Sequence, residues 1–153
     1  MQVSIDGSVP TIHDACRGDG NFRRAVEGIK SLRKCNISVT VRVTIHRHNV
    51  TDLESIAKFL LEDIGLPQFS TNAASHFGLC RQNAEQVQLT TGERTLSMET
   101  LLRLSRKYPG RISAAAGPLA EGRMWLEMEE ARLAGKDRLP NRGCLTSCGC
   151  PSQ

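Results

Sequence analysis

Hydrophobic and polar residues alternate in three short segments of the chain, and this two-residue period is typical of β-strands. In residues 39–45 every odd-numbered position is valine or isoleucine, whereas the even-numbered positions hold two threonines and Arg42. Residues 3–6 and 69–73 follow the same pattern, with Ser4 on the polar side of the first segment and Ser70 and Asn72 on that of the second. The pattern predicts three strands that each have one apolar and one polar face.

Between these strands, apolar residues recur at intervals of three and four, which predicts amphipathic helices. Thr51 and Glu54 have the spacing of a capping box at the start of one of them. Because strands and helices alternate, the chain is expected to adopt an α/β fold with a parallel sheet. The expected helices begin at Asn21, after the Thr51 cap, near Ser97 and at Pro118, with a long loop over 76–93 and a short fourth strand within 111–117.

The polar strand faces constrain the architecture further. Parallel strands covered by helices on both sides read as nearly unbroken apolar runs, and these strands do not. A curled sheet with helices outside and a polar lumen explains the pattern, while an open sheet with one solvated face is the alternative. Arg42 at mid-strand is costly to bury unless it meets an anion. We therefore expect Arg42, Ser4 and Asn72 to face one polar space, with the valines of 39–45 under the helices.

Length and composition fit an ordinary globular domain. The chain has 153 residues, 39% of them hydrophobic and 24% charged, and a formal net charge of +4. No apolar run reaches membrane-spanning length, so we expect no membrane partner and a cytoplasmic location. The basic residues in 21–34 lack aromatic neighbours, which favours a solvated helix face over nucleic-acid binding.

Three of the six cysteines, Cys144, Cys148 and Cys150, crowd the end of the sequence and are better interpreted as metal or cluster ligands than as a disulfide framework. His46 and His48 form a conceivable metal pair, although a solvated loop is the preferred interpretation.

His13 and Asp14 could form an acid–base pair, but the preferred interpretation is that they organise the loop after the first strand. Sequence motifs of serine hydrolases (G-x-S-x-G), zinc peptidases (H-E-x-x-H) and P-loop proteins do not occur.

Three stretches of the sequence carry more specific patterns. They are VSIDGSVPTIHDACRGDGNFRRAVEGIKSL, VTVRVTIHRHNVTDLESIAKFLLEDIG and LPQFSTNAASHFGLC. They resemble the fourth, fifth and sixth strand units of radical SAM enzymes of the SPASM type, and most of all the maturases that modify ribosomally made peptides. The resemblance is specific in the first two stretches and weaker after Gln82.

The resemblance implies a fold, cofactors and partners. Residues 1–140 would be the second half of a partial (β/α)6 TIM-like barrel, with parallel strands and outer helices, and residues 141–153 the start of a SPASM region. The family binds a 4Fe–4S cluster and S-adenosyl-L-methionine (SAM), and generates a 5′-deoxyadenosyl radical that abstracts hydrogen from substrate. A peptide substrate and the N-terminal half of the barrel are the implied partners.

The site residues follow from the resemblance and from the strand faces. Ser4 matches the family's fourth-strand serine that faces the SAM ribose, and Asp6 is expected to order the following loop. From its facing and charge, Arg42 is expected to pair with the methionine carboxylate, and Asn72 to contact adenine or ribose. The alternative for each is a lumen residue without ligand contact.

The sequence departs from the family pattern in its cysteines. It contains no C-x-x-x-C-x-x-C loop for the catalytic cluster, so we expect a fragment truncated at both ends and inactive alone. Cys148, followed by Cys144 and Cys150, is the candidate ligand of an auxiliary cluster, which three thiolates alone do not complete. A half-barrel binding module that needs a separate partner chain is the alternative function, and a complete α/β protein unrelated to SAM is the third.

Overall fold

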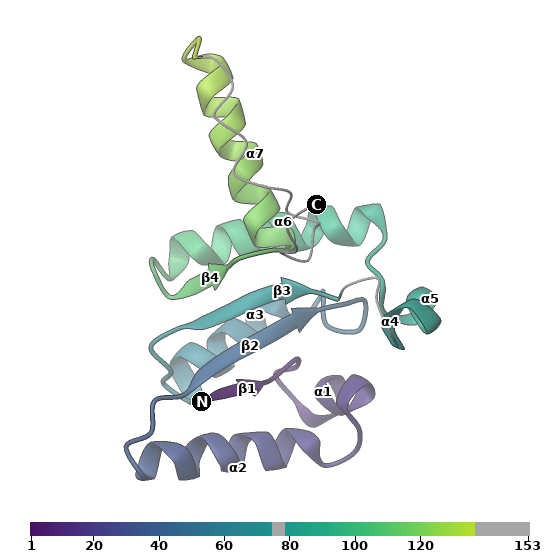
Figure 1. The fold of residues 1–153 in the computed structure, drawn as a ribbon, viewed down its shortest axis with the longest axis vertical. Helices are drawn as coiled ribbons and strands as arrows, with labels where there is room; N and C mark the ends of the chain where they lie inside the picture. Colours follow the sequence, from purple (N-terminus) through teal and green to yellow (C-terminus); the bar gives the residue numbers. More distant parts are fainter. Residues whose placement is uncertain (75–78, 137–153) are drawn as a thin grey trace, which may run out of the picture.

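The computed structural model describes residues 1–74 and 79–136, with a four-stranded parallel sheet at its centre (Figure 1). The strands are β1 (Gln2–Ser4), β2 (Thr40–Ile45), β3 (Phe69–Ala73) and β4 (Ile112–Ala114), and they lie side by side in that order. The helices are α1 (Pro10–Arg17), α2 (Asn21–Lys34), α3 (Leu53–Lys58), α4 (Leu79–Gln82), α5 (Ala84–Val87), α6 (Thr91–Lys107) and α7 (Pro118–Leu133), and a π-helical turn over Phe59–Asp63 follows α3.

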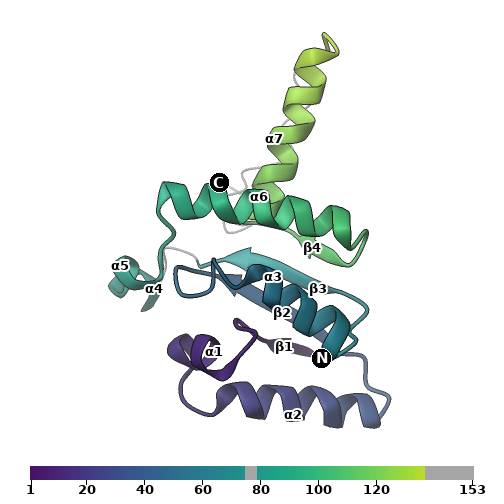
Figure 2. The ribbon, with the colours of Figure 1, turned by 180° about the vertical axis from the view of Figure 1, so that it is seen from behind.

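The long helices and the apolar strand faces share one core. Helix α3 lies behind the sheet in Figure 1 and in front of it in Figure 2. Ile29 of α2, Ile56 of α3 and Leu101 of α6 pack in the same buried cluster as the strands. Strands that follow chain order occur in (β/α) barrels, whereas a doubly wound sheet reverses its order. The α/β class with a parallel sheet is confirmed, and closure into a partial barrel stays a prediction.

The predicted orientation of the second strand is confirmed. Val41, Val43 and Ile45 are fully buried in the core, and Val39 just before β2 is 8% exposed. Arg42, between two of these valines, is exposed. Because successive side chains point to opposite faces of a strand, the polar positions of β2 lie on the face away from the helices.

Helix α1 falls where the sequence pattern predicts only a loop. Pro10 occupies its first turn, a position where the missing N–H costs nothing. Its one buried residue is His13. A helix that buries a histidine instead of an apolar stripe gives no periodic signal, which explains why the pattern missed it.

The starts of helices α6 and α3 also differ from expectation. Helix α6 begins at Thr91 rather than near Ser97, because Thr90 Oγ1 accepts from the Glu93 N–H and the Glu93 carboxylate accepts from the Thr90 N–H. The predicted box at Thr51 is wrong. The cap of α3 is Asp52, whose carboxylate instead accepts both the N–H and the hydroxyl of Ser8 at 2.7 and 2.8 Å. Two further helices, α4 and α5, occupy the expected long loop.

Helix α7 packs on α6 only near its start. Pro118, Leu119 and Gly122 are buried there, and a Cβ on Gly122 would lie 3.1 Å from Leu102. Beyond this contact the helix extends away from the sheet, as both ribbon views show. None of the described helices combines the length and the apolar character needed to cross a bilayer.

Candidate functional site

The register of the sheet assembles a polar row from all four strands. Ser4 of β1 pairs with Arg42, Arg42 with Ser70 of β3, and Ser70 with Ser113 of β4. In-register neighbours of a parallel sheet present their side chains on the same face. One guanidinium and three hydroxyl groups therefore lie in a line across the face opposite the helices. Asn72 lies two residues beyond Ser70 on the same face.

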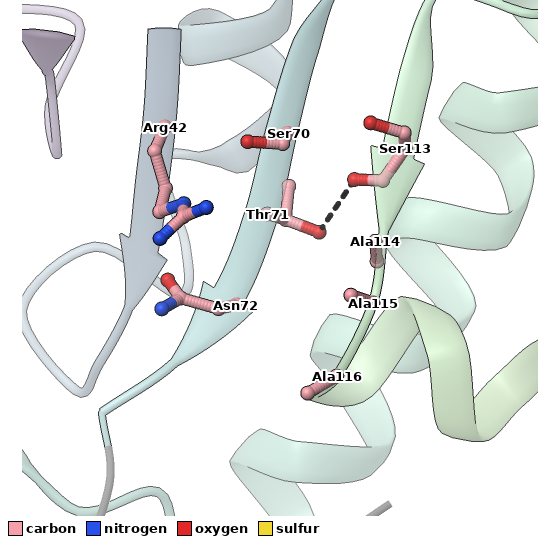
Figure 3. A pocket seen from close by; sticks show the side chains of 8 residues that line it. All are labelled: Arg42, Ser70, Thr71, Asn72, Ser113, Ala114, Ala115 and Ala116. Carbon is pink, nitrogen blue, oxygen red and sulfur yellow. Dashed lines mark hydrogen bonds between the residues drawn. The ribbon is translucent and has the colours of Figure 1, made fainter. Parts of the chain in front are cut away.

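A pocket of about 450 Å³ opens over the β2–β4 part of this row (Figure 3). Its volume falls within the range of small-molecule sites. Ser4 is not one of the lining residues, although it lies next to Arg42 in the sheet. The lining residues are Arg42, Ser70, Thr71, Asn72, Ser113, Ala114, Ala115 and Ala116.

Arg42 and Asn72 supply the polar groups with unused bonding capacity in this pocket. No carboxylate in residues 1–74 or 79–136 forms an ion pair with Arg42. The Asn72 side-chain oxygen is buried and has no hydrogen-bond partner within those ranges. Figure 3 shows both side chains pointing toward the same part of the pocket. A guanidinium binds a carboxylate with two parallel hydrogen bonds, and the amide oxygen accepts from an N–H or O–H.

The far wall of the pocket is fixed by contacts between β3, β4 and the start of α7. Thr71 Oγ1 donates to the Ser113 carbonyl at 3.5 Å, the bond drawn in Figure 3. Gly117, which precedes α7, has a φ of 83° and lies so close to β3 that a Cβ would be 2.7 Å from the Ala73 nitrogen. Arg123 of α7 donates to the Ile112 carbonyl at 3.1 Å. These contacts hold the alanine run 114–116 against the end of β3.

Asp6 joins the loops that follow β1 and β2. It is 1% exposed, and its carboxylate accepts from Arg17 Nε at 2.6 Å and from the Thr44 N–H at 2.7 Å. The Asp6 N–H donates to His13 Nδ1, and its carbonyl accepts from the Asn49 amide. These bonds agree with the expected loop-ordering role of Asp6. Both carboxylate oxygens of Asp6 already accept hydrogen bonds within the chain. The expected contact of Asp6 with a cofactor stays a prediction.

The two histidines nearest this cluster are buried. Burial lowers the pKa of His13, and the opposing field of Asp6 is weaker than this effect. Burial also lowers the pKa of His46 to about 4. His46 Nδ1 lies 3.7 Å from Cys16 Sγ, and its Nε2 has no partner among the residues that the structure describes.

The expectations for the histidine motifs are therefore met in part. His48 is exposed as expected, but His46 is 3% exposed and belongs to the core rather than to a solvated loop. The predicted role in organising the loop after the first strand is confirmed for His13, whereas Asp14 lies in α1 and organises the connection between α1 and α2. His13 accepts from the Asp6 N–H, and the Asp14 carboxylate accepts from the N–H groups of Gly20 and Phe22.

Side chains that could bind a metal ion do not cluster in the described part of the chain. No group of three histidine, cysteine, aspartate or glutamate side chains within it has a metal-binding arrangement. The predicted ligands Cys144, Cys148 and Cys150 lie outside the described residues, as does the expected boundary at 140/141. They stay predictions.

The structure brings together three of the four predicted cofactor residues, Ser4, Arg42 and Asn72, on one face. Sequence reasoning placed Ser70 on the polar side of its strand but did not assign it to the site, and it missed Ser113. The alternation of Ile112, Ser113 and Ala114 could have indicated that Ser113 lies on the polar face of its strand. The strand was too short for that alternation to identify its register.

The arrangement defines an α/β protein with a polar pocket on the open face of a parallel sheet. No family model matches the chain. A stretch of 58 residues, 37% of the chain, is 36% identical to the mycofactocin maturase MftC of Mycobacterium tuberculosis (strain CDC 1551 / Oshkosh). The protein of the same name in Mycobacterium ulcerans (strain Agy99) is 34% identical over 58 residues. The matched stretch spans only 15% and 16% of the length of these two relatives.

Proposed function

We propose that this chain forms the SAM-facing part of a radical SAM barrel that acts on a peptide. The observation that carries the proposal is the row Ser4–Arg42–Ser70–Ser113 across the open face of a sequentially ordered parallel sheet. The partial similarity to a maturase of the radical SAM class supports the same assignment. Residues 1–140 are proposed as the barrel segment.

The polar groups of this face match those of SAM. Arg42, without a carboxylate partner in the described residues, would bind the methionine carboxylate. Ser4, beside it in the sheet, would hydrogen-bond the ribose hydroxyls, and the unpartnered Asn72 oxygen would accept from the adenine amino group or from ribose. When SAM is bound beside a reduced 4Fe–4S cluster, it supplies the radical that abstracts hydrogen from substrate.

The catalytic cluster is proposed to be held by another polypeptide segment, because this sequence has no C-x-x-x-C-x-x-C loop. That segment would be the N-terminal half of the barrel, either in the same protein or in a separate partner chain. Cys148, with Cys144 and Cys150, is proposed as part of an auxiliary cluster that needs a further ligand. A cytoplasmic location stays a prediction.

Titration with SAM tests the proposed site. In amide NMR spectra, which detect weak binding, SAM should shift resonances of the row and of the strand ends around it. Arg42→Ala should weaken SAM binding about tenfold or more, because a charge-assisted hydrogen-bond pair is lost. Arg106→Ala, which removes an exposed arginine from α6, is the matched control and should leave binding unchanged.

Two competitors define which part of SAM each residue recognises. Methionine should compete for the unsubstituted site and fail to compete in Arg42→Ala, whereas adenosine should compete in both. Shifts confined to residues away from the row and its strand ends, or equal SAM affinity in Arg42→Ala and in the unsubstituted chain, would contradict the proposed site. Those results would favour the third interpretation, an α/β protein unrelated to SAM.

A further inference from the structure

Helix α7 carries large apolar side chains that no described element covers. Trp125 is 60% exposed, Met128 42% and Leu133 72%. They occupy the part of the helix beyond its contact with α6, which extends away from the sheet in both ribbon views. Single exposed apolar residues are ordinary, but a group of them along a projecting helix is typical of an interaction surface.

These side chains share one side of the helix. Successive residues of an α-helix are turned by about 100°, so Trp125, Met128, Glu129, Arg132 and Leu133 lie within one broad stripe. Within this stripe Arg132 donates to the Glu129 carboxylate, with 2.9 Å from Nε to Oε2. We call this stripe the α7 face.

The charges of α7 limit how the α7 face can be covered. Glu127 and Glu130 project from the other side of the helix by the same 100° rotation, so they do not oppose a partner at the α7 face. The face itself contains one acid, Glu129, and one base, Arg132, three residues apart. A second α7 helix that runs in the opposite direction presents its arginine to Glu129 and its glutamate to Arg132. Such a helix is therefore complementary to the α7 face in charge.

We propose that the α7 face pairs with the α7 face of a second copy of this chain, with the two helices antiparallel. When Glu129 of one copy lies opposite Arg132 of the other, the two-fold symmetry creates that ion pair twice. The same register places Met128 opposite Leu133 in both directions, and Trp125 opposite residue 136 of the other copy, just beyond the end of its helix. A parallel arrangement would instead place Glu129 against Glu129, which is unfavourable.

The size of the contact sets its strength. In this register the two helices lie side by side over residues 128–133, roughly 9 Å of helix at about 1.5 Å per residue. This is below the size of a standard stable interface, so the association is weak and dependent on concentration. The open face of the sheet is not involved, and the pairing is therefore independent of SAM binding.

Sedimentation equilibrium over a wide range of protein concentration tests the pairing, with Trp125 as an internal probe because it is the one tryptophan of the chain. The apparent mass should rise toward that of two chains, and the Trp125 emission should shift to shorter wavelength over the same range. Leu133→Glu should raise the dissociation constant about tenfold or more, through lost apolar contact and a buried charge. Leu96→Glu, at an exposed leucine of α6, should leave it unchanged.

Charge reversal tests the register. Glu129→Arg should weaken the pairing because it faces Arg132 of the second copy, and adding Arg132→Glu should restore it. Glu27→Arg breaks the exposed Arg23–Glu27 pair of α2 and is the matched control for loss of an ion pair within a helix. Circular dichroism checks that helix content is equal in all variants.

The proposal is overturned by a single-chain mass at every concentration. It is also overturned if Leu133→Glu associates like the unsubstituted chain, which would point to a sheet edge instead. Trp125 emission that is already blue-shifted, and does not change with concentration, would mean that another segment of the same chain covers the α7 face.

Discussion

At the scale of single residues, the C-terminal ends of β1 and β2 are joined by buried polar side chains as well as by the apolar packing of Ile5 and Ile45. Asn49 is fully buried, donates to the carbonyls of Asp6 and Thr44, and accepts from the His46 N–H. Buried polar groups are costly unless they are hydrogen-bonded. The cluster therefore stabilises this edge of the sheet only while its hydrogen bonds are kept.

The protonation of His13 and His46 predicts a loss of stability in mild acid. Burial lowers the pKa of both groups, that of His46 from 6.5 to about 4. Below about pH 6.5 the unfolded chain binds protons that the folded chain does not, so the free energy of unfolding should fall as the pH drops toward 4. For His46 alone the loss should reach roughly 3 kcal/mol. Denaturant unfolding at several pH values measures it.

A substitution separates His46 from the carboxylates that also titrate in acid. His46→Gln removes the titrating imidazole, so the fall in unfolding free energy between pH 6.5 and 5 should become shallower. His48→Gln changes the exposed neighbour and should retain the original pH dependence. If both variants keep the original slope, His46 does not carry the effect.

At the scale of elements, the approach of α7 to β3 depends on a glycine. Gly117 has φ 83° and ψ −169°, a conformation open essentially to glycine alone. A Cβ there would also meet the backbone of Ala73, which cannot move as a flexible side chain can. The position of the pocket wall at 114–116 therefore follows from the absence of a side chain at residue 117.

Gly117→Ala should lower the free energy of unfolding by about 2 to 3 kcal/mol, through backbone strain and the close contact with β3. Gly92→Ala is the matched control. Gly92 lies in the first turn of α6 with open space around it, so alanine should stabilise the helix by about 0.5 kcal/mol. Thermal and denaturant unfolding measure both. Equal stability of Gly117→Ala and the unsubstituted chain would refute the argument from strain.

At the scale of the whole molecule, the described residues present the polar row that we propose binds SAM, and they hold no group of metal ligands. Residues 1–74 and 79–136 hold no metal-binding group of three side chains, and the full sequence has no C-x-x-x-C-x-x-C loop. The proposed function therefore divides the chemistry between this chain and the segment that would hold the cluster.

Anaerobic reconstitution with iron, sulfide, reductant and SAM should consequently yield no 5′-deoxyadenosine from this chain alone. Adding a polypeptide that carries the cluster loop and the first half of the barrel should restore SAM cleavage, and Arg42→Ala should reduce the restored rate. Chromatographic detection of 5′-deoxyadenosine measures it. Formation of that product by the chain alone would contradict the division of the chemistry.

The sequence by itself determined the class of fold and the facing of its strands. The alternation of valine and isoleucine with polar residues in 39–45 was enough to predict that Arg42 faces away from the helices, because the two-residue period is a local property of a strand. The starts of α2 at Asn21 and of α7 at Pro118 were also predicted from local signals in the sequence. Local patterns of apolar residues and helix-start signals carried these features.

The tertiary structure alone decided which polar residues meet. Ser4, Arg42, Ser70 and Ser113 are far apart in sequence, and only the register of the strands places them in one row. Helix α1 and the hydrogen bonds from Ser8 to the Asp52 carboxylate were not predictable from a local pattern. Both depend on contacts between residues that are not neighbours in the sequence. The spacing of apolar residues indicates which side of a helix or strand faces the core. The alignment of one element with another depends on packing that involves the whole chain.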